Sequence, residues 1–522
     1  MYKSLRKKKL EEDMEKEKNE SRKTLAKALE ENIDIIKKVF LDDQTLKYRV
    51  FQNKNLSAAK CCTIYLDGMV NSEIINENII QPILQEDFSD NISGENLMEE
   101  LRYKVLVANN IDISDNLNSI TAALFEGDTI LLVEACDKAL LISSKGGETR
   151  AISEPLSAQV VRGPREGFTE SIMTNISLIR RKIKSYELKF KFKEIGERTH
   201  TKICICYIDD IVSKDILKEL EKRLDEINID AVLDSGYIQE LIRDAPFSPF
   251  ETVGHTERPD VVAGKLLEGR IAVIVDGSPV VITVPFILAE ATQSNEDYYN
   301  NYIFASFNRI LRITSNILAV SVPAVFLAIV TYHQEMIPTP LLLSITASRE
   351  GVPFSTVLSM FIMLLIFDIL REVGNRMPVP IGQAVNIVGT LVMGEAAVQA
   401  RLVSAPIVII TALTGILTLM NVNFIGATII VRTLLLLASS IVGIYGYLFG
   451  FIVAELHLMS LKSFGVPYAL NINSVKDHNA QDFWIRSPWW SMTLRPKIIA
   501  ARNMVRQTKK TSDQPTKKTK ER

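Results

Sequence analysis

Cysteine and histidine are scarce in this sequence, and neither gathers into a motif. Five residues of each type are spread over 522 positions, and no two cysteines show the C-x-x-C spacing of a metal site or a redox pair. The P-loop, zinc-protease and serine-hydrolase patterns (G-x-x-x-x-G-K-S/T, H-E-x-x-H and G-x-S-x-G) are also missing. We therefore expect no enzyme, no cofactor and no metal, and we expect the thiols to be reduced and buried.

A secretory signal is missing from the N-terminus as well. The basic residues in MYKSLRKKKLEEDMEKEKNE (1–20) are followed by more charged residues and not by an apolar segment. Residues 1–42 are predicted to form a charged arm, helical or disordered, and its mixed charges argue against nucleic-acid binding. We therefore expect the N-terminal region to stay in the cytosol.

Long apolar runs are present, but only in the second part of the chain. The run from Ile313 to Thr331 contains no ionisable side chain over 19 residues, close to the roughly 20 that span a bilayer's hydrocarbon core. Further runs occur at 354–370, 379–400, 405–420 and 424–456. The sequence therefore predicts an integral membrane protein with an all-α, multi-span transmembrane domain.

The charged residues around these runs predict the orientation. Arg309 and Arg312 precede the first run, and the tail after Leu461 is rich in Lys and Arg, so the positive-inside rule places both ends in the cytosol. The number of crossings must then be even. The sequence leaves four or six crossings open, with 379–400 re-entrant, or a further crossing at 338–347 or within a divided last run. Trp484, Trp489 and Trp490 are expected to lie on the inner headgroups.

The region before the membrane runs contains an internal repeat. CCTIYLDGMVNSEII (61–75) matches ICICYIDDIVSKDIL (203–217) with Tyr65 over Tyr207, an offset of 142 residues (207 − 65). The same offset places Gly127 over Gly269. Each copy shows a β-branched strand, two helices and a hairpin, the second with Asp-Gly (276–277) at its turn. We therefore expect an α/β cytosolic region of two related subdomains.

These segments predict the domain boundaries. After the arm at 1–42 come a first α/β subdomain at 43–148, a linker with an amphipathic helix at 149–201, a second α/β subdomain at 202–292, the transmembrane domain at 293–460 and a basic tail at 461–522.

Polar residues within the membrane region concentrate in IGQAVNIVGTLVMGEAAVQA (381–400), whose small residues permit close helix packing. A charge facing lipid costs roughly 2.5 to 3.5 kcal/mol, so Glu395 is expected to face protein or water. One hypothesis is an ion pathway lined by Asn386, Gly389, Thr390, Val392, Met393, Glu395 and Gln399. The other is a structural ion pair of Glu395 with Arg432 or Arg401. Asp368 is expected to anchor its span at the interface.

Four further charged residues lie in turn-rich motifs near the domain boundaries: Arg162, Glu166, Glu257 and Arg258. We expect them to pair across subdomains or subunits. The alternative is that they are solvated loop charges.

Four ordered motifs resemble one known family. They are RGPREGF (162–168), TERPDVVAGKLLEGRIAVIVDGSPVVITVPF (256–286), REVGNRMPVPIGQAVNIVGTLVMGEAAVQARLVS (371–404) and FGVPYAL (464–470). Together they resemble the GerA family, and within it the A subunits of bacterial spore germinant receptors.

The resemblance implies a function and partners. It implies a protein of the spore inner membrane that acts with an amino-acid-permease-like B subunit and a lipoprotein C subunit. It also implies a homo-oligomer around a nutrient-gated cation pathway that triggers germination. The alternatives are a SpoVAF-like accessory membrane protein, a non-conducting scaffold and a secondary transporter. The sequence does not indicate which germinant is recognised.

Overall fold

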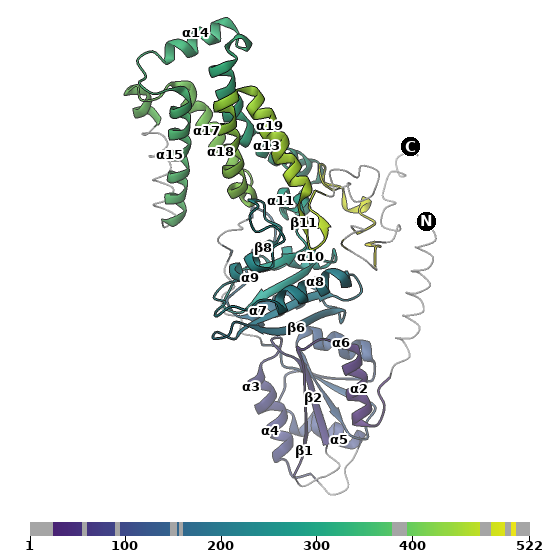
Figure 1. Ribbon diagram of the computed structural model, residues 1–522. Coiled ribbons are helices and arrows are strands. Elements are labelled where there is room, and N and C mark those ends of the chain that lie inside the picture. Colours follow the sequence, from purple (N-terminus) through teal and green to yellow (C-terminus); the bar gives the residue numbers. More distant parts are fainter. Residues whose placement is uncertain are drawn as a thin grey trace, which may run out of the picture. The chain divides into compact units, whose positions relative to one another are not determined.

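The computed structural model describes residues 24–54, 60–88, 94–146, 154–155, 160–377, 394–469, 482–495, 499 and 503–507. These residues form two compact units (Figure 1). One contains the described residues up to Arg243, the segment Val253 to Pro285 and the C-terminal residues from Trp489. The other contains Asp244–Thr252 and Phe286–Pro488.

The first subdomain is a five-stranded antiparallel sheet in the order β1-β2-β4-β5-β3. Its strands are β1 (Leu46–Gln52), β2 (Lys60–Leu66), β3 (Ile111–Ser114), β4 (Asp128–Val133) and β5 (Ala139–Ser143). The helices α2 (Leu29–Val39) and α6 (Leu117–Glu126) pack on one face. The other face carries α3 (Ser72–Ile74), η1 (Ile75–Ile80), α4 (Gln81–Gln85), α5 (Glu95–Glu100) and η2 (Leu101–Val105).

This arrangement explains why the strands are apolar throughout. Successive side chains of a strand point to opposite faces of the sheet. In β4, Ile130 and Leu132 pack against α2 and α6, whereas Leu131 and Val133 pack against the helices of the other face. A strand covered on both faces therefore shows a continuous apolar run.

The second subdomain has the same architecture, in the order β6-β7-β9-β10-β8. Its strands are β6 (Leu188–Ile195), β7 (Thr201–Ile208), β8 (Gly254–Thr256), β9 (Ile271–Val275) and β10 (Val281–Val284). Its helices are α7 (Ile172–Lys182), α8 (Lys214–Asp225), α9 (Ser235–Ile242) and α10 (Pro259–Leu266). Strand β6 thus belongs to this sheet, although the sequence assigns residues 149–201 to a linker, and α2 lies in the first subdomain's core although it falls within 1–42.

The predicted duplication is confirmed by strand order and by register. Pairs of the first sheet recur 142 residues later in the second: Lys47–Tyr65 as Lys189–Tyr207, Cys62–Leu132 as Cys204–Ile274, Leu131–Leu140 as Val273–Ile282, and Ile113–Leu140 as His255–Ile282. Gly127 and Gly269 both adopt positive φ, 88° and 95°, after corresponding helices. The likeness extends to α2 and α7, where Asn32 and Asn175 each accept a backbone N–H at 2.7 Å from the residue six positions earlier.

The second unit is built from helices. They are α11 (Leu288–Thr292), α12 (Glu296–Tyr299), α13 (Tyr302–Tyr332), η3 (Gln334–Met336), α14 (Thr339–Ser348), α15 (Thr356–Arg376), α17 (Ala405–Leu419), η4 (Val422–Phe424), α18 (Ile425–Val442) and α19 (Ile444–Ser460). A short hairpin follows, β11 (Lys462–Ser463) and β12 (Val466–Pro467). Among the described residues, Tyr302–Tyr332 and Val422–Val442 are long and apolar enough to cross a membrane, and 339–348, 405–419 and 444–460 are shorter apolar helices.

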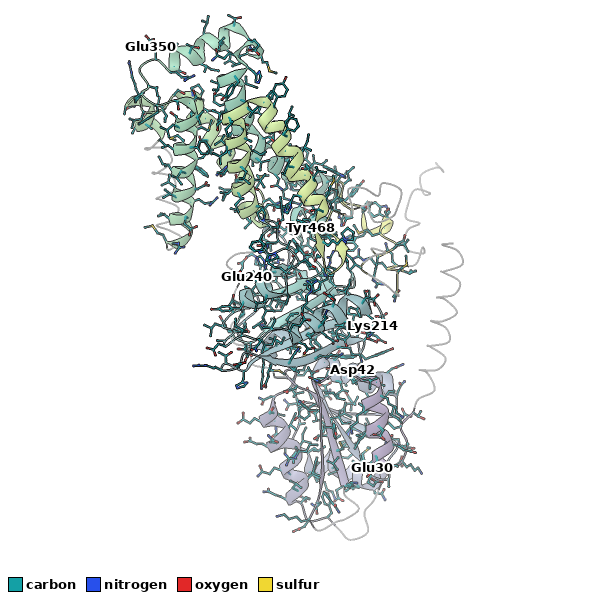
Figure 2. All side chains as sticks on the ribbon, viewed as in Figure 1. Glu30, Asp42, Lys214, Glu240, Glu350 and Tyr468 are labelled. Carbon is teal, nitrogen blue, oxygen red and sulfur yellow. The ribbon has the colours of Figure 1, made fainter. Side chains whose placement is uncertain are left out.

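The helix directions follow from contacts at the ends of this unit. The turn residue Glu350 lies at one end and Tyr468 at the other (Figure 2). Tyr332, at the end of α13, donates its hydroxyl to the carbonyl of Ser440 near the end of α18 at 2.7 Å, so α13 and α18 run the same way. The last apolar run is divided at Gly443, whose φ is +66°, and α19 runs back from there.

The described part of the C-terminal tail packs against the second subdomain. Arg495 donates to the carbonyl of Leu267 at 2.8 Å, Arg506 pairs with Glu268 at 3.1 Å and Asn503 donates to Asp210 at 3.0 Å. Trp489, expected at the headgroups, stacks on Arg506 with 5.6 Å to its ring centroid. The chain therefore returns to its first unit after the long helices.

Candidate functional site

The helices of the second unit pack closely where glycine faces a neighbour. A Cβ on Gly415 of α17 would lie 2.1 Å from the ring of Phe367 in α15, and one on Gly446 of α19 would lie 2.1 Å from the carbonyl oxygen of Ala438 in α18. Only a residue without a side chain permits these distances, as in tightly packed membrane helices. Gly351 before α15 lies beside Arg401 before α17, so α15 and α17 run in parallel.

A charged cluster is enclosed in this bundle. Arg432 of α18 has 2% of its side chain exposed and contacts the Asp368 carboxylate of α15 at 2.6 Å. Arg371, one turn after Asp368, contacts the other carboxylate oxygen at 3.3 Å. Removing one member of a buried ion pair strands a charge at a cost of about 3–5 kcal/mol. The cluster therefore fixes α15 against α18.

A second buried cluster lies where α13 begins. Arg309 is fully buried and contacts Asp297 at 3.2 Å and Asp482 at 2.9 Å. Arg312 pairs with Asp297 too, and Tyr298 donates its hydroxyl to Asp482 at 2.5 Å. The cluster joins the segment before the first long helix to the segment after the last one.

Comparison with known proteins gives the chain its family. Residues 34–498 match the family described as Bacillus/Clostridium GerA spore germination protein. The chain is 42% identical to spore germination protein KA of Bacillus subtilis (strain 168) over 454 residues, 87% of this chain and 83% of that protein. It is 34% identical to spore germination protein B1 of the same organism, over 92% of this chain and 99% of that protein.

The chain belongs to the GerA family. Within the family it is a spore germination protein of the A-subunit type. It is also 39% identical to the uncharacterized membrane protein YfkQ of Bacillus subtilis (strain 168), over 84% of this chain and 85% of that protein. The crystal structure of the N-terminal domain of the A subunit of the Bacillus megaterium spore germinant receptor GerK3 aligns with 32% identity and a TM-score of 0.39, over 51% of this chain and 98% of that one.

Most of the predicted pathway of this GerA protein lies outside the described residues. Asn386, Gly389, Thr390, Val392 and Met393 fall there. The other two pathway residues lie in a helical segment, 394–399, and both are exposed on the single chain. The amide of Gln399 donates to the Glu395 carboxylate at 2.9 Å, as their one-turn spacing predicted.

The carboxylate beside Arg432 is that of Asp368, not that of Glu395. From the sequence, Arg432 was one of two possible partners of Glu395 in the ion-pair hypothesis, and Asp368 was expected to anchor its span at the interface. The partner depends on which helices are neighbours, and α15 lies beside α18 at the position of Arg432. A signal was present nonetheless, because Asp368 is an acid in an otherwise apolar run and needs a counter-charge.

The charged residues of the turn-rich motifs contact groups of the second subdomain. The guanidinium of Arg258 binds Asp260 at 2.7 Å and the carbonyl of Pro164 at 3.1 Å. Glu166 pairs with Lys182 at 2.8 Å, and the carbonyl of Glu257 accepts from the N–H of Phe168 at 2.8 Å. Arg162 is exposed. Pairing of these residues with another subunit stays a prediction.

The cluster at the start of α13 was not predicted from the sequence. Arg309 and Arg312 were expected to precede the first span on its cytosolic side, and the structure adds that both bind acids in buried surroundings. The partner Asp482 is distant from Arg309 in the sequence, so no local sequence pattern predicts their contact.

Proposed function

We propose that this GerA protein is the A subunit of a nutrient-responsive germinant receptor and forms, as a homo-oligomer in the spore inner membrane, a gated cation pathway. In this proposal it acts with a permease-like B subunit and a lipoprotein C subunit. Family membership supports the receptor role. The segment 381–400 lines this pathway.

The observation that carries the pathway proposal is the exposure of Glu395. Ala397 and Val398 of the same segment pack into the core formed by α13, α15 and α18, so Glu395 belongs to the helical bundle. Its carboxylate is exposed on the single chain beside Gln399. Facing lipid there would cost roughly 2.5 to 3.5 kcal/mol, and this cost disappears when neighbouring copies enclose water. A ring of carboxylates around such a path favours cations.

Ion flux tests the proposal. The protein, reconstituted in liposomes with its B and C partners, should release K⁺ in response to nutrient. Glu395→Gln should reduce the release, because each copy loses one carboxylate of the ring. Val392→Ala should release K⁺ without nutrient, because a narrow apolar ring that excludes water becomes wider.

Glu372→Gln is the matched control. Glu372 is an exposed acid that pairs with Arg376 at 2.8 Å near the end of α15, and its substitution should leave the flux unchanged. Assembly without any flux from the wild type would favour a scaffold. Equal flux from the Glu395→Gln and wild-type proteins would exclude the carboxylate ring.

A further inference from the structure

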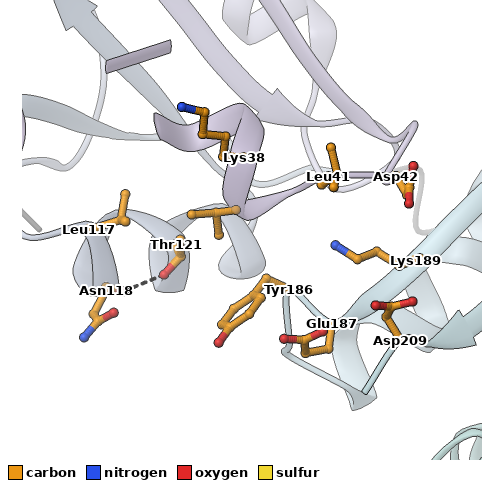
Figure 3. Close-up of a pocket in the computed structure, with 11 residues that line it drawn as sticks. Lys38, Leu41, Asp42, Leu117, Asn118, Thr121, Tyr186, Glu187, Lys189 and Asp209 are labelled. Carbon is orange, nitrogen blue, oxygen red and sulfur yellow. Dashed lines mark hydrogen bonds between the residues drawn. The ribbon is translucent and has the colours of Figure 1, made fainter. Parts of the chain in front are cut away.

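Two cavities of the described chain differ in how their charges are balanced. One, of about 310 Å³, lies between the cytosolic subdomains, and there Lys189 faces Asp42 and Glu187, so cation and anions oppose each other within the chain (Figure 3). The other, of about 350 Å³, lies in the second unit at the turn between α14 and α15. It is lined by Thr346, Ala347, Arg349, Glu350, Val352 and Phe354.

Two arginines meet at this turn without a counter-charge. Arg349 lines the cavity, and the guanidinium of Arg401 lies against Gly351, with its Nη1 2.9 Å from where a Cβ would be. Among the described residues, neither guanidinium forms an ion pair or a hydrogen bond, and Glu350 pairs with neither. Two guanidiniums and one carboxylate leave one positive charge in excess. A guanidinium presents a planar fork of N–H donors that fits a phosphate group.

The helix before this turn is apolar and exposed. α14 (TPLLLSITAS) has no ionisable side chain, and Ile345 is the buried residue among its ten. Leu341 and Leu343 are two positions apart and therefore on opposite sides of the helix, yet they are 54% and 65% exposed. A protein partner covers one side of such a helix, whereas acyl chains surround it. Exposure on opposite sides therefore favours lipid as the partner.

The position of α14 in the bundle agrees with this partner. The helix connects the end of α13 with the start of α15, at the end of the unit where Glu350 lies (Figures 1 and 2). Ten residues extend over about 15 Å, half of the roughly 30 Å of a hydrocarbon core. The last residue of α13 is Tyr332, and polar residues follow it at 333–335, as is typical of a membrane–water boundary. A short, exposed, apolar helix at such a boundary is typical of an interfacial segment.

We propose that α14 and the turn at 349–351 bind an anionic phospholipid of the leaflet at this end of the bundle. The phosphate contacts the guanidiniums of Arg349 and Arg401, and the acyl chains pack against α14. Phe354 and Leu402, close to the two arginines in sequence, are 41% and 47% exposed and extend the apolar surface. Arg349 precedes α15 and Arg401 precedes α17, so the bound lipid holds the starts of these two helices together. This role is independent of the ion pathway.

Native mass spectrometry of the full-length protein in detergent tests the proposal. The protein is titrated with dioleoyl phosphatidylglycerol, dioleoyl phosphatidylethanolamine, glycerol 3-phosphate and inorganic phosphate. Phosphatidylglycerol should bind most tightly. Glycerol 3-phosphate and inorganic phosphate should bind at least about tenfold more weakly, since they lack the acyl chains that pack on α14.

The opposite end of α15 offers a matched control. Arg349→Gln combined with Arg401→Gln should weaken phosphatidylglycerol at least about tenfold, because the charge-assisted contacts are lost. Arg376→Gln should have no effect, because Arg376 is an exposed arginine that already pairs with Glu372 at 2.8 Å. Melting temperatures verify that each variant is folded.

A second experiment locates α14 in the bilayer. Leu341→Cys and Leu343→Cys are labelled with an environment-sensitive fluorophore, and the protein is placed in phosphatidylglycerol vesicles that carry spin labels on their acyl chains. Both positions should be quenched, because lipid surrounds the helix.

Four results would overturn the proposal. They are no binding of phosphatidylglycerol by the wild type, equal affinity of the double arginine variant and the wild type, binding of phosphatidylethanolamine or inorganic phosphate as tight as that of phosphatidylglycerol, and quenching at only one of the two leucine positions, which would show that protein covers the other side of α14.

Discussion

Arg180 shows how one side chain joins the two cytosolic subdomains. It lies on α7 with 1% of its side chain exposed and pairs with Asp43, whose side chain is fully buried in the turn after α2. It also donates to the hydroxyl of Thr45 at 3.0 Å, and its guanidinium lies 4.6 Å from the ring centroid of Phe190. The interface therefore depends on a charge with little access to water.

Replacing Arg180 should therefore destabilise the cytosolic unit. Arg180→Met leaves the Asp43 carboxylate buried without its counter-charge, and the free energy of unfolding should fall by about 3–5 kcal/mol. This loss of stability can be measured as a lower thermal midpoint of the purified protein and as faster deuterium exchange along β6. Arg181→Met, at an exposed neighbouring position of α7, should change neither. Adding Asp43→Asn to Arg180→Met should recover part of the loss, and equal stability of the two arginine variants would show that the pair is dispensable.

At the scale of elements, glycine determines how closely the helices of the second unit approach one another. Gly415→Ala places a methyl group 2.1 Å from the Phe367 ring, so α15 and α17 must separate or the ring must move. Overpacking of this kind costs typically about 1–3 kcal/mol. The variant should melt at a lower temperature in detergent and accumulate less in membranes.

Gly426 of α18 offers the same chemical change without the clash, since nothing lies within 4 Å of a Cβ placed there. Gly426→Ala should raise stability slightly, by roughly 0.5–1 kcal/mol, because alanine loses less backbone freedom in a helix. If Gly415→Ala and Gly426→Ala had the same melting temperature, the close contact of α15 with α17 would be absent from the protein in its membrane.

Elements whose signal lies within a short stretch of sequence could be predicted from that sequence. The repeated strands were predictable because burial on both faces makes them apolar and because one offset aligns Tyr65 with Tyr207 and Gly127 with Gly269. The partner of Arg432 could not be predicted, because several acids in apolar runs are chemically equivalent until it is known which helices are neighbours. The burial of Arg309 could not be predicted either, since its partner Asp482 comes after the last long helix.

On the scale of the whole molecule, two observations constrain the number of crossings. The strands before the first long helix and the tail after the last belong to one compact unit, so we predict an even number of crossings. The described helices α15 and α17 run in the same direction, whereas successive crossings must alternate. We therefore predict six crossings, which satisfy both conditions and place the turn at Glu350 on the outer side.

Cysteine labelling of intact cells checks this topology. Glu350→Cys should react with a membrane-impermeant maleimide, whereas Glu197→Cys and Ser491→Cys should react only after the membrane is opened. The five native thiols are buried, and burial raises the pKa of Cys61 and of Cys62 to about 12. Because the thiolate is the reactive form, these thiols should stay unlabelled. External labelling of Ser491→Cys would require an odd number of crossings.

The return of the tail to the second subdomain has a consequence for biosynthesis. The two sheets leave the ribosome first, and residues 489–507 leave it after every apolar helix has been made. The contacts of Arg495 with Leu267 and of Arg506 with Glu268 can therefore form only when the intervening helices have been made and the tail has returned to the first unit. A chain that stalls or inserts with one helix missing leaves Leu267 and Glu268 uncovered, and this exposed site would distinguish unfinished molecules from finished ones.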